Sequence, residues 1–415
     1  MKLSHGLHLA YCTNVHRGET WAETFDSLNN HTLRVKERVA PAGRYAIGLR
    51  LSDQASRELC DPETLLAFQR WLDRCDCYVF TINGFPFGQF HGTRVKENVY
   101  RPDWTDPRRL DYTKRLFDLL AQLVPAGIEG SVSTSPGSFK DFITSPEQER
   151  AMRDNFWSCV EHIAALSERS KRQLHLGVEP EPFGWFENTA ETLRFFDQMR
   201  DEHPNDERLE RHLGVNYDAC HFAIEFENPA QAVAQFQAHG IRLSKIHLSN
   251  ALKLQPTATS IQQLASFAED VYLHQVIVRA ADGSLTKFRD LPAALECARP
   301  RVQQRPAASG NQQSPSAPSD HVAVPGDGHT PADEWRVHFH VPLHWQPTGE
   351  LNTTADHVLG LMKLLQDQPT LCSHLEMETY TWAVLPEAVR SRDVTEQIVA
   401  EYEWTLRQLT ARGLR

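Results

Sequence analysis

Four apolar segments of the sequence each end on a side chain that can bind a metal ion. The residues are Glu179, Asp218 with His221 three positions later, His247 and Glu376. Carboxylates combined with imidazoles form a mixed oxygen and nitrogen set, which suits Mn²⁺, Zn²⁺, Fe²⁺ or Mg²⁺ better than Ca²⁺ or a thiolate-bound metal. The four segments therefore predict a divalent metal site, provided that the fold brings their ends together.

Each of these residues alone is a weak indicator. A single acid at the end of a strand usually caps the backbone or faces solvent, and a single histidine there is usually a satisfied polar residue. The joint pattern on four successive segments is much less frequent by chance, so it favours the metal site.

The elements that must position these residues follow a regular alternation. Strands are expected at 7–12, 45–51, 78–82, 130–134, 174–179, 213–218, 241–247 and 372–378, and helices at 21–39, 62–74, 110–124, 146–167, 190–199, 229–239 and 394–409. Alternating strands and helices are typical of a parallel sheet with right-handed crossovers, and eight units favour a closed barrel. We predict an α/β fold, a (β/α)₈ TIM barrel, in which chemistry is located at the carboxyl ends of the strands.

The regular order breaks between the seventh and eighth predicted strands. Segments 270–279 and 285–288 flank Ala-Asp-Gly-Ser and predict a hairpin, and 335–342 predicts a further strand that pairs with it. Residues 299–333 are rich in Pro, Ser, Gln and Gly and predict a flexible or disordered insertion. We expect a single TIM-barrel domain over 1–415 that contains this insertion.

The composition disfavours several classes of protein. The net charge of −11 argues against general nucleic-acid binding, which needs a basic surface. No apolar run of about 18 residues occurs, so no membrane insertion is expected. His5 and His8 interrupt the apolar character of the N-terminal segment, and we expect a cytoplasmic protein. Eight cysteines without a CxxC pair indicate reduced thiols.

Four motifs resemble those of the xylose isomerase-like TIM barrels. They are LGVEPEP at 176–182, GVNYDACH at 214–221, IHLSN at 246–250 and HLEME at 374–378. This superfamily contains sugar isomerases, epimerases and DNA repair enzymes of the endonuclease IV type. The resemblance implies that Glu179, Asp218, His247 and Glu376 are metal ligands and that His221 contacts substrate.

The resemblance also implies a reaction. Glu179 and Glu376 would exchange a proton with a carbon next to a carbonyl group that the metal polarises. Glu378 lies two residues after Glu376 and faces the same way, so it is the alternative ligand from the eighth strand.

One branch of this superfamily is more similar to the sequence. The motifs YCTN at 11–14, GETW at 18–21, YLHQ at 272–275, DLP at 290–292, HFHVP at 338–342 and EMETYTW at 376–382 resemble the EboE-type metabolite traffic proteins. The resemblance implies a role in supplying or moving a small metabolite, alongside enzymes of a shared gene cluster.

Further polar residues are candidates for binding the substrate. His338 and His340 alternate onto one face of their predicted strand, and Lys245 points inward below His247. The remaining candidates are His274, Asn14, Glu378 and Trp382. The alternatives to substrate binding are purely structural. The histidines would then lie in a polar core, and Lys245 would form a buried ion pair with Glu179 or Asp218.

The leading hypothesis is a divalent-metal-dependent isomerase or epimerase that acts on a small polyhydroxy metabolite by carboxylate-mediated proton transfer. One alternative is a non-catalytic carrier that binds the metabolite and hands it on. A second alternative is a metal hydrolase of the endonuclease IV type, which the acidic net charge disfavours. The expected partner is a small molecule, with contacts to enzymes of the same pathway; the sequence does not give the oligomeric state.

Overall fold

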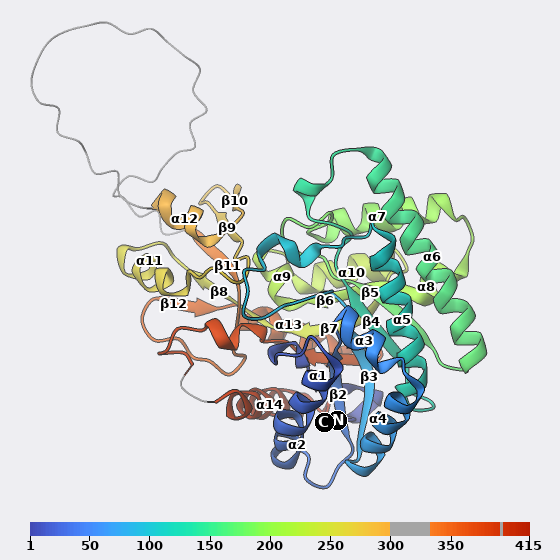
Figure 1. The fold of residues 1–415 in the computed structure, drawn as a ribbon. Coiled ribbons are helices and arrows are strands. Elements are labelled where there is room, and N and C mark those ends of the chain that lie inside the picture. Colours follow the sequence, from blue (N-terminus) through green and yellow to red (C-terminus); the bar gives the residue numbers. More distant parts are fainter. Residues whose placement is uncertain (299–332, 391–392) are drawn as a thin grey trace, which may run out of the picture.

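The computed structural model describes residues 1–298, 333–390 and 393–415 (Figure 1). Within these ranges, eight parallel strands form a barrel. In barrel order they are β1 (His8–Tyr11), β2 (Tyr45–Arg50), β3 (Cys77–Asn83), β4 (Gly130–Thr134), β5 (Leu174–Val178), β6 (Leu213–Asp218), β7 (Arg242–Leu248) and β13 (His374–Met377). Parallel pairing runs from β2 through β7 and β13 to β1, so the predicted TIM barrel is confirmed.

The seam between β1 and β2 depends on a glycine. A parallel bridge joins Cys12 to Gly48 across this seam. A Cβ atom at Gly48 would lie 2.7 Å from the carbonyl oxygen of Tyr11 and 2.0 Å from Oε1 of Glu376. Only a residue without a side chain therefore lets the seam close while Glu376 occupies the inside of the barrel.

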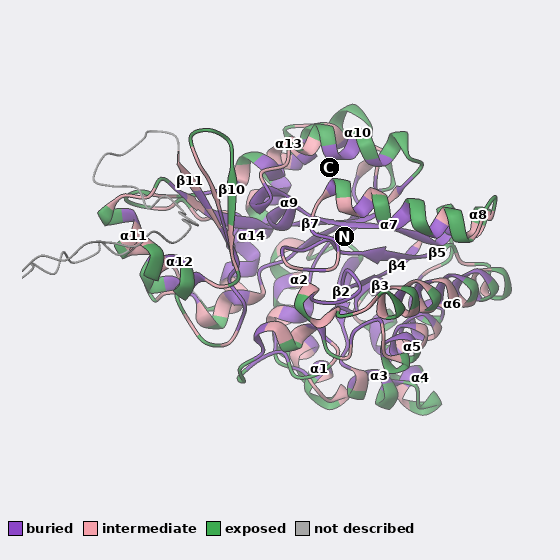
Figure 2. Cartoon of the chain, turned by 90° about the horizontal axis from the view of Figure 1, so that it is seen from above, coloured by how far each residue is buried: buried purple, intermediate pink, exposed green. Residues whose placement is uncertain are grey.

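An outer layer of helices covers the barrel. It contains α1 (Trp21–Ser27), α2 (Leu33–Val39), α3 (Asp53–Leu59), α4 (Pro62–Arg74), α5 (Pro107–Leu123), α6 (Pro146–Ser170), α7 (Thr189–Glu202), α8 (Glu207–His212), α9 (Ala219–Ile224), α10 (Pro229–Ala238), α13 (Ala355–Asp367) and α14 (Val394–Thr410). Figure 2 shows buried strands at the centre and exposed residues on the outer faces of these helices. The helix expected at 21–39 is divided by a turn of π-helix, Leu28–Thr32.

A second sheet is inserted between β7 and β13. In the described part of the chain it has five strands in the order β10-β9-β11-β8-β12. Their bounds are β8 (Asn250–Leu254), β9 (Val276–Arg279), β10 (Leu285–Phe288), β11 (Glu334–Val341) and β12 (Leu351–Thr353), and α11 (Ala258–Leu264) and α12 (Leu291–Ala298) accompany them. The predicted hairpin is β9–β10, and β11 pairs with β9 as expected. The flexible insertion predicted at 299–333 lies outside the described residues, except for Asp333.

Strand β11 has two different faces because side chains alternate along a strand. Val337, Phe339 and Val341 belong to the apolar core of the inserted sheet. His338 and His340 lie on the opposite face and are buried near the carboxyl end of the barrel. The inserted sheet therefore contributes two histidines to the region where the barrel strands end.

A buried acid joins the end of the barrel to the segment after β11. Glu401 of α14 accepts hydrogen bonds from the Thr379 hydroxyl at 2.7 Å and the Leu343 amide at 3.0 Å. Burial raises the pKa of Glu401 from 4.5 to about 7. The unfolded chain loses this proton at lower pH than the folded chain, so the free energy of unfolding should fall as pH rises from 4.5 to 7.

We expect this effect to reach about 3 kcal/mol and to be absent in Glu401→Gln, which retains an acceptor oxygen but does not titrate. Urea unfolding at pH 5 and pH 8 measures it. If the variant and the wild type lose the same stability between these pH values, Glu401 does not carry the effect.

Candidate metal centre

Four buried side chains meet at the carboxyl ends of consecutive barrel strands. Glu179 follows β5, Asp218 ends β6, His247 lies on β7 and Glu378 follows β13. One ligand atom from each of these four residues lies within 4.8 Å of the other three. His247 Nδ1 is 3.1 Å from Glu378 Oε2, 3.3 Å from Glu179 Oε1 and 3.4 Å from Asp218 Oδ2. We refer to these four residues as the acidic group.

The acidic group fits a divalent metal ion. Ligand atoms that are ~2.0–2.2 Å from a shared metal lie roughly 3–3.5 Å from one another, and His247 Nδ1 lies in this range from an oxygen atom of each of the three carboxylates. Asp218 Oδ2 has no hydrogen-bond partner among the described residues. Burial by itself would raise the pKa of Asp218, but His221, His340 and His247 hold it well below its ordinary value. A charged carboxylate with unused lone pairs is what a metal requires.

His247 carries a proton that a metal would replace. Burial would lower the pKa of His247, but Glu378 and the neighbouring carboxylates raise it well above its ordinary value. The imidazolium is thus the cation of the acidic group in the protein without metal. Metal binding requires the unprotonated nitrogen, so we expect binding to release a proton and to weaken at low pH.

Glu376 lies outside the acidic group. Its Oε2 atom accepts hydrogen bonds from Lys245 Nζ at 2.6 Å and from His247 Nε2 at 2.9 Å, and all three side chains are fully buried. Burial would raise the pKa of Glu376, but Lys245 and His247 hold it at about 2. Glu376 therefore orients His247 from behind, and Glu378, the alternative ligand from the sequence, is the glutamate of this segment that belongs to the acidic group.

Amide side chains position two carboxylates of the acidic group. Asn14 Nδ2 and Asn83 Nδ2 donate to Glu378 Oε1 at 2.8 and 3.1 Å. Asn216 Nδ2 donates to Glu179 Oε2 at 2.7 Å. In each glutamate the other oxygen faces His247 Nδ1. Asn14 was expected to contact substrate, whereas Asn83 was missed because it ends a strand without an obvious ligand motif.

Three histidines lie beside the acidic group. His221 comes from α9, and His338 and His340 come from β11. The Nε2 atom of His338 is 3.1 Å from that of His221 and 3.2 Å from that of His340. The sequence named all three as substrate contacts, and the structure brings them together with Asp218 between them and the other carboxylates.

Three predicted substrate residues lie elsewhere: His274, Trp382 and Lys245, which is fully buried against Glu376. His274 supports the inserted sheet, with Nδ1 donating to the His338 carbonyl at 2.8 Å and Nε2 at 2.6 Å from Glu269. Trp382 packs against the core of the inserted sheet and lines a different, smaller hollow. Neither His274 nor Trp382 is among the described residues that line the pocket over the acidic group.

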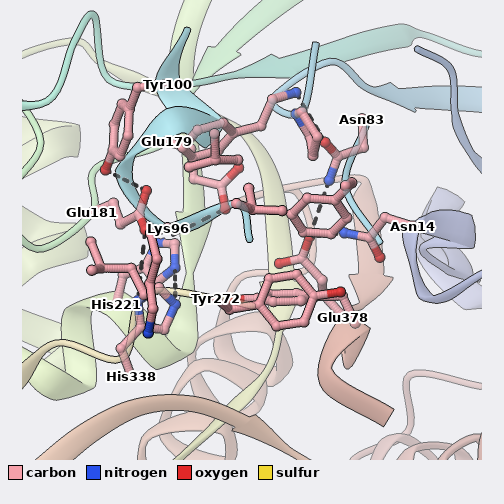
Figure 3. Close-up of a pocket in the computed structure, with 17 residues that line it drawn as sticks. Asn14, Asn83, Lys96, Tyr100, Glu179, Glu181, His221, Tyr272, His338 and Glu378 are labelled. Atoms are coloured by element: carbon pink, nitrogen blue, oxygen red, sulfur yellow. Dashed lines mark hydrogen bonds and ion pairs between the residues drawn. The ribbon is translucent and has the colours of Figure 1, made fainter. Parts of the chain in front are cut away.

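An aromatic pocket covers the acidic group and the histidines (Figure 3). Its lining consists of Asn14, Asn83, Phe85, Pro86, Phe90, Val95, Lys96, Val99, Tyr100, Glu179, Glu181, His221, Tyr272, Leu273, His338, Glu378 and Tyr380. Seven of these residues, from Phe85 to Tyr100, belong to the long loop after β3. The Tyr100 hydroxyl donates to Glu181 at 2.6 Å, and burial raises the pKa of Glu181 to about 7.

No protein-family model and no curated protein matches the chain. Solved structures with a similar fold include the probable 3-DHS dehydratase AsbF from Bacillus anthracis, at 12% identity and a TM-score of 0.46 over 96% of this chain and 99% of that one. A xylose isomerase-like TIM barrel protein from Mycobacterium smegmatis, in complex with magnesium, has 13% identity and a TM-score of 0.44 over 92% and 87% of the two chains. The 3-keto-D-glucoside 4-epimerase YcjR from E. coli has 15% identity and a TM-score of 0.36 over 58% and 78%. The likeness concerns the fold alone.

None of the helices in 1–298, 333–390 and 393–415 is long and apolar enough to cross a membrane. The eight cysteines all lie in these ranges and are free thiols, as expected.

Proposed function

We propose that the protein is a divalent-metal-dependent isomerase or epimerase that acts on a small polyhydroxy metabolite. The observation that carries this proposal is the pair Glu179 and Glu378. Both glutamates belong to the acidic group and both line the pocket. They come from β5 and β13, which lie on either side of β6 and β7, so they flank the position between the ligand atoms.

A metal in the acidic group would polarise the carbonyl of a bound α-hydroxycarbonyl substrate and acidify the neighbouring C–H bond. One glutamate then removes the proton from that carbon, and the other returns a proton to it. Asn216 fixes Glu179 through Oε2, and Asn14 fixes Glu378 through Oε1, so the remaining oxygen of each is held toward the centre. We therefore propose Glu378, in place of the Glu376 that the sequence suggested, for this acid–base role.

The aromatic residues of the pocket suit a polyhydroxy substrate and proton transfer at one of its carbon atoms. Phe90, Tyr272 and Tyr380 form a cluster with ring centroids 5.0–5.2 Å apart. Aromatic faces of this kind pack against the C–H faces of a sugar and exclude water from the reacting carbon.

The EboE-type resemblance adds the context of this proposal. We infer that the product or substrate belongs to a pathway of metabolite supply or traffic in the cytoplasm, with contacts to enzymes of that pathway. We also propose that residues 1–415 form a single TIM-barrel domain that contains the insertion at 299–333.

Deuterium exchange tests the proposed reaction. The Mn²⁺-loaded protein is incubated in D₂O with a panel of ketoses and their epimers, and mass spectrometry follows deuterium at carbon. We expect metal-dependent incorporation that falls at least ~100-fold in Glu179→Gln, because a positioned acid or base typically contributes that much. Glu401→Gln, a buried glutamate outside the site, serves as the control.

The carrier alternative predicts a different result. A metal-loaded protein that binds a sugar of the panel without any incorporation of deuterium would replace the enzyme with a metabolite carrier. Incorporation at the same rate in Glu179→Gln would remove that residue from the reaction.

A further inference from the structure

The pocket over the acidic group has two surfaces of different chemistry. Its floor is polar and contains Glu179 and Glu378 of the acidic group. A second part of the lining is apolar and consists of Phe85, Pro86, Val95, Val99 and Leu273. We refer to these five residues as the apolar wall. The first four lie in the loop after β3, and Leu273 lies between α11 and β9.

The apolar wall is fixed by its own packing. Phe85 and Leu273 belong to one buried cluster, and Val95 belongs to a second. Val99 packs against both clusters and joins them. The Val95 amide donates to the Val271 carbonyl at 2.8 Å, which ties the loop after β3 to the segment that carries Leu273. The wall is therefore a continuous and preformed surface, as is usual for the binding sites of small molecules.

Two tyrosine hydroxyls of the pocket already donate to protein atoms. The Tyr100 hydroxyl donates to Glu181 Oε2 at 2.6 Å (Figure 3). His91 Nε2 is 2.6 Å from the Asn14 carbonyl oxygen, which only accepts, so Nε2 carries a proton. Burial lowers the pKa of His91 to about 4, so the ring is neutral at pH 7 and its Nδ1 atom accepts from the Tyr272 hydroxyl at 2.6 Å. Neither hydroxyl proton is therefore available to a ligand.

The ammonium group of Lys96 is paired as well. Lys96 Nζ donates to Asp290 Oδ2 at 2.7 Å and to the Glu269 carbonyl at 3.0 Å. The Lys96 side chain is 5% exposed, so its charge is balanced inside the protein. A substrate hydroxyl against the apolar wall would lose its hydrogen bonds to water, and the side chains of the wall offer none in return. A hydrocarbon group at the same place would instead be stabilised by its burial.

We propose that the substrate is a small polyhydroxy compound with an α-hydroxycarbonyl end and a hydrocarbon substituent. The α-hydroxycarbonyl end lies at the acidic group, and the substituent packs against the apolar wall. This inference rests on the proposed function, because the acidic group fixes the position of the reacting carbon. A free sugar has a hydroxyl group on almost every carbon, so it matches the floor of the pocket but not the wall.

The rival explanation is a wall that only anchors the loop after β3 to the rest of the protein. The substrate would then stay at the floor of the pocket, and a group attached beyond the reacting carbons would not affect the reaction. Substrates that share the reactive end and differ only at the far end separate the two explanations.

The test compares dihydroxyacetone with its mono-butyl ether and its mono-(3-hydroxypropyl) ether. The two ethers have equal numbers of non-hydrogen atoms and differ only in a terminal methyl or hydroxyl group. The Mn²⁺-loaded protein is incubated with each compound in D₂O, and kcat/KM is measured for incorporation of deuterium at the hydroxymethyl carbon. We expect the butyl ether to exceed both other compounds at least ~10-fold, because one carbon group in an apolar pocket typically contributes that much.

A substitution in the wall tests where the substituent binds. Val99→Thr places a hydroxyl group on the wall with little change in shape, so it should reduce the preference for the butyl ether several-fold. Val271→Thr is the matched control. Val271 packs against the same cluster as Val95 and is not among the described residues that line the pocket, so this variant should retain the preference of the wild type.

The proposal is overturned if dihydroxyacetone or the hydroxypropyl ether reacts as fast as the butyl ether, or if Val99→Thr retains the full preference. Exchange on none of the three compounds contradicts the proposed reaction instead. Calorimetric titration of the Mn²⁺-loaded protein with the same compounds then decides the inference. Tighter binding of the butyl ether supports a hydrocarbon substituent at the wall, and equal or weaker binding refutes it.

Discussion

Replacing Glu378 by glutamine is expected to weaken Mn²⁺ binding far more than replacing Glu376. Glu378 Oε2 faces His247 Nδ1 at 3.1 Å, inside the acidic group, whereas Glu376 holds the far nitrogen of the same ring. Loss of an outer partner such as Glu376 typically reduces metal affinity 10–100-fold. Loss of a direct ligand should exceed that range, and calorimetric titration with Mn²⁺ measures both variants.

Stability provides the control for this prediction. Three buried carboxylates near one position repel each other when no metal is bound, so metal-free Glu378→Gln should melt at a higher temperature than metal-free wild type. With Mn²⁺ in excess the order should reverse, because binding stabilises only the protein that retains the site. If Glu376→Gln abolishes binding and Glu378→Gln does not, the ligand from the eighth strand is Glu376.

Replacing Lys245 by methionine is expected to destabilise the fold by about 3 kcal/mol or more, because one charge of a buried pair would remain without its partner. Lys245 and Glu376 are both 0% exposed and 2.6 Å apart. Only His247 would remain to compensate the Glu376 carboxylate. Denaturant unfolding measures the change, with Lys253→Met as the control, since its partner Asp356 is exposed to solvent and the pair should contribute at most about 1 kcal/mol.

The double variant Lys245→Met with Glu376→Gln separates charge from packing. If the unpaired charge causes the loss, the double variant should recover most of it, since no charge is left buried. A single variant as stable as the wild type, or a double variant that is no better than the single, would contradict the ion-pair explanation.

The barrel and three of the four positions in the acidic group could be predicted because they depend on local patterns. Glu179, Asp218 and His247 each follow a short apolar run, and in a parallel barrel the ends of such runs meet at one mouth. Alternation along a strand likewise placed His338 and His340 on one face. These patterns do not require knowledge of how distant strands align.

The position of the eighth strand depends on long-range register instead. Glu376 pairs with His247 across β13 and β7, so its side chain lies level with Lys245 and His247 and forms hydrogen bonds with both. Glu378 lies beyond the end of the strand and reaches the ligand atoms. Both glutamates face the same way, and only the register of β13 with β7 decides which of them reaches the other ligand atoms of the acidic group.

The sequence analysis missed strand β8, and it placed Trp382 and His274 in the substrate pocket, where they do not lie. Only Ser249 separates β7 from β8, so the two strands read as one run in the sequence. Trp382 was named from its place after the eighth strand, and His274 by analogy with His338 and His340. Both side chains instead help to build the inserted sheet, where Trp382 packs, partly buried, against the core and His274 donates to the His338 carbonyl.

Strand β11 belongs to two structural units at once. One face completes the core of the inserted sheet, and the other face presents His338 and His340 to the end of the barrel. His340 Nδ1 also donates to the backbone carbonyl of Glu378, so the position of this glutamate in the acidic group depends on the order of the inserted sheet. If a divalent ion binds the acidic group only while the inserted sheet is in place, an ion at 100 times its dissociation constant would add about 2.7 kcal/mol to the stability of the native arrangement. Detachment of the inserted sheet from the barrel would then be rarer when the metal is bound.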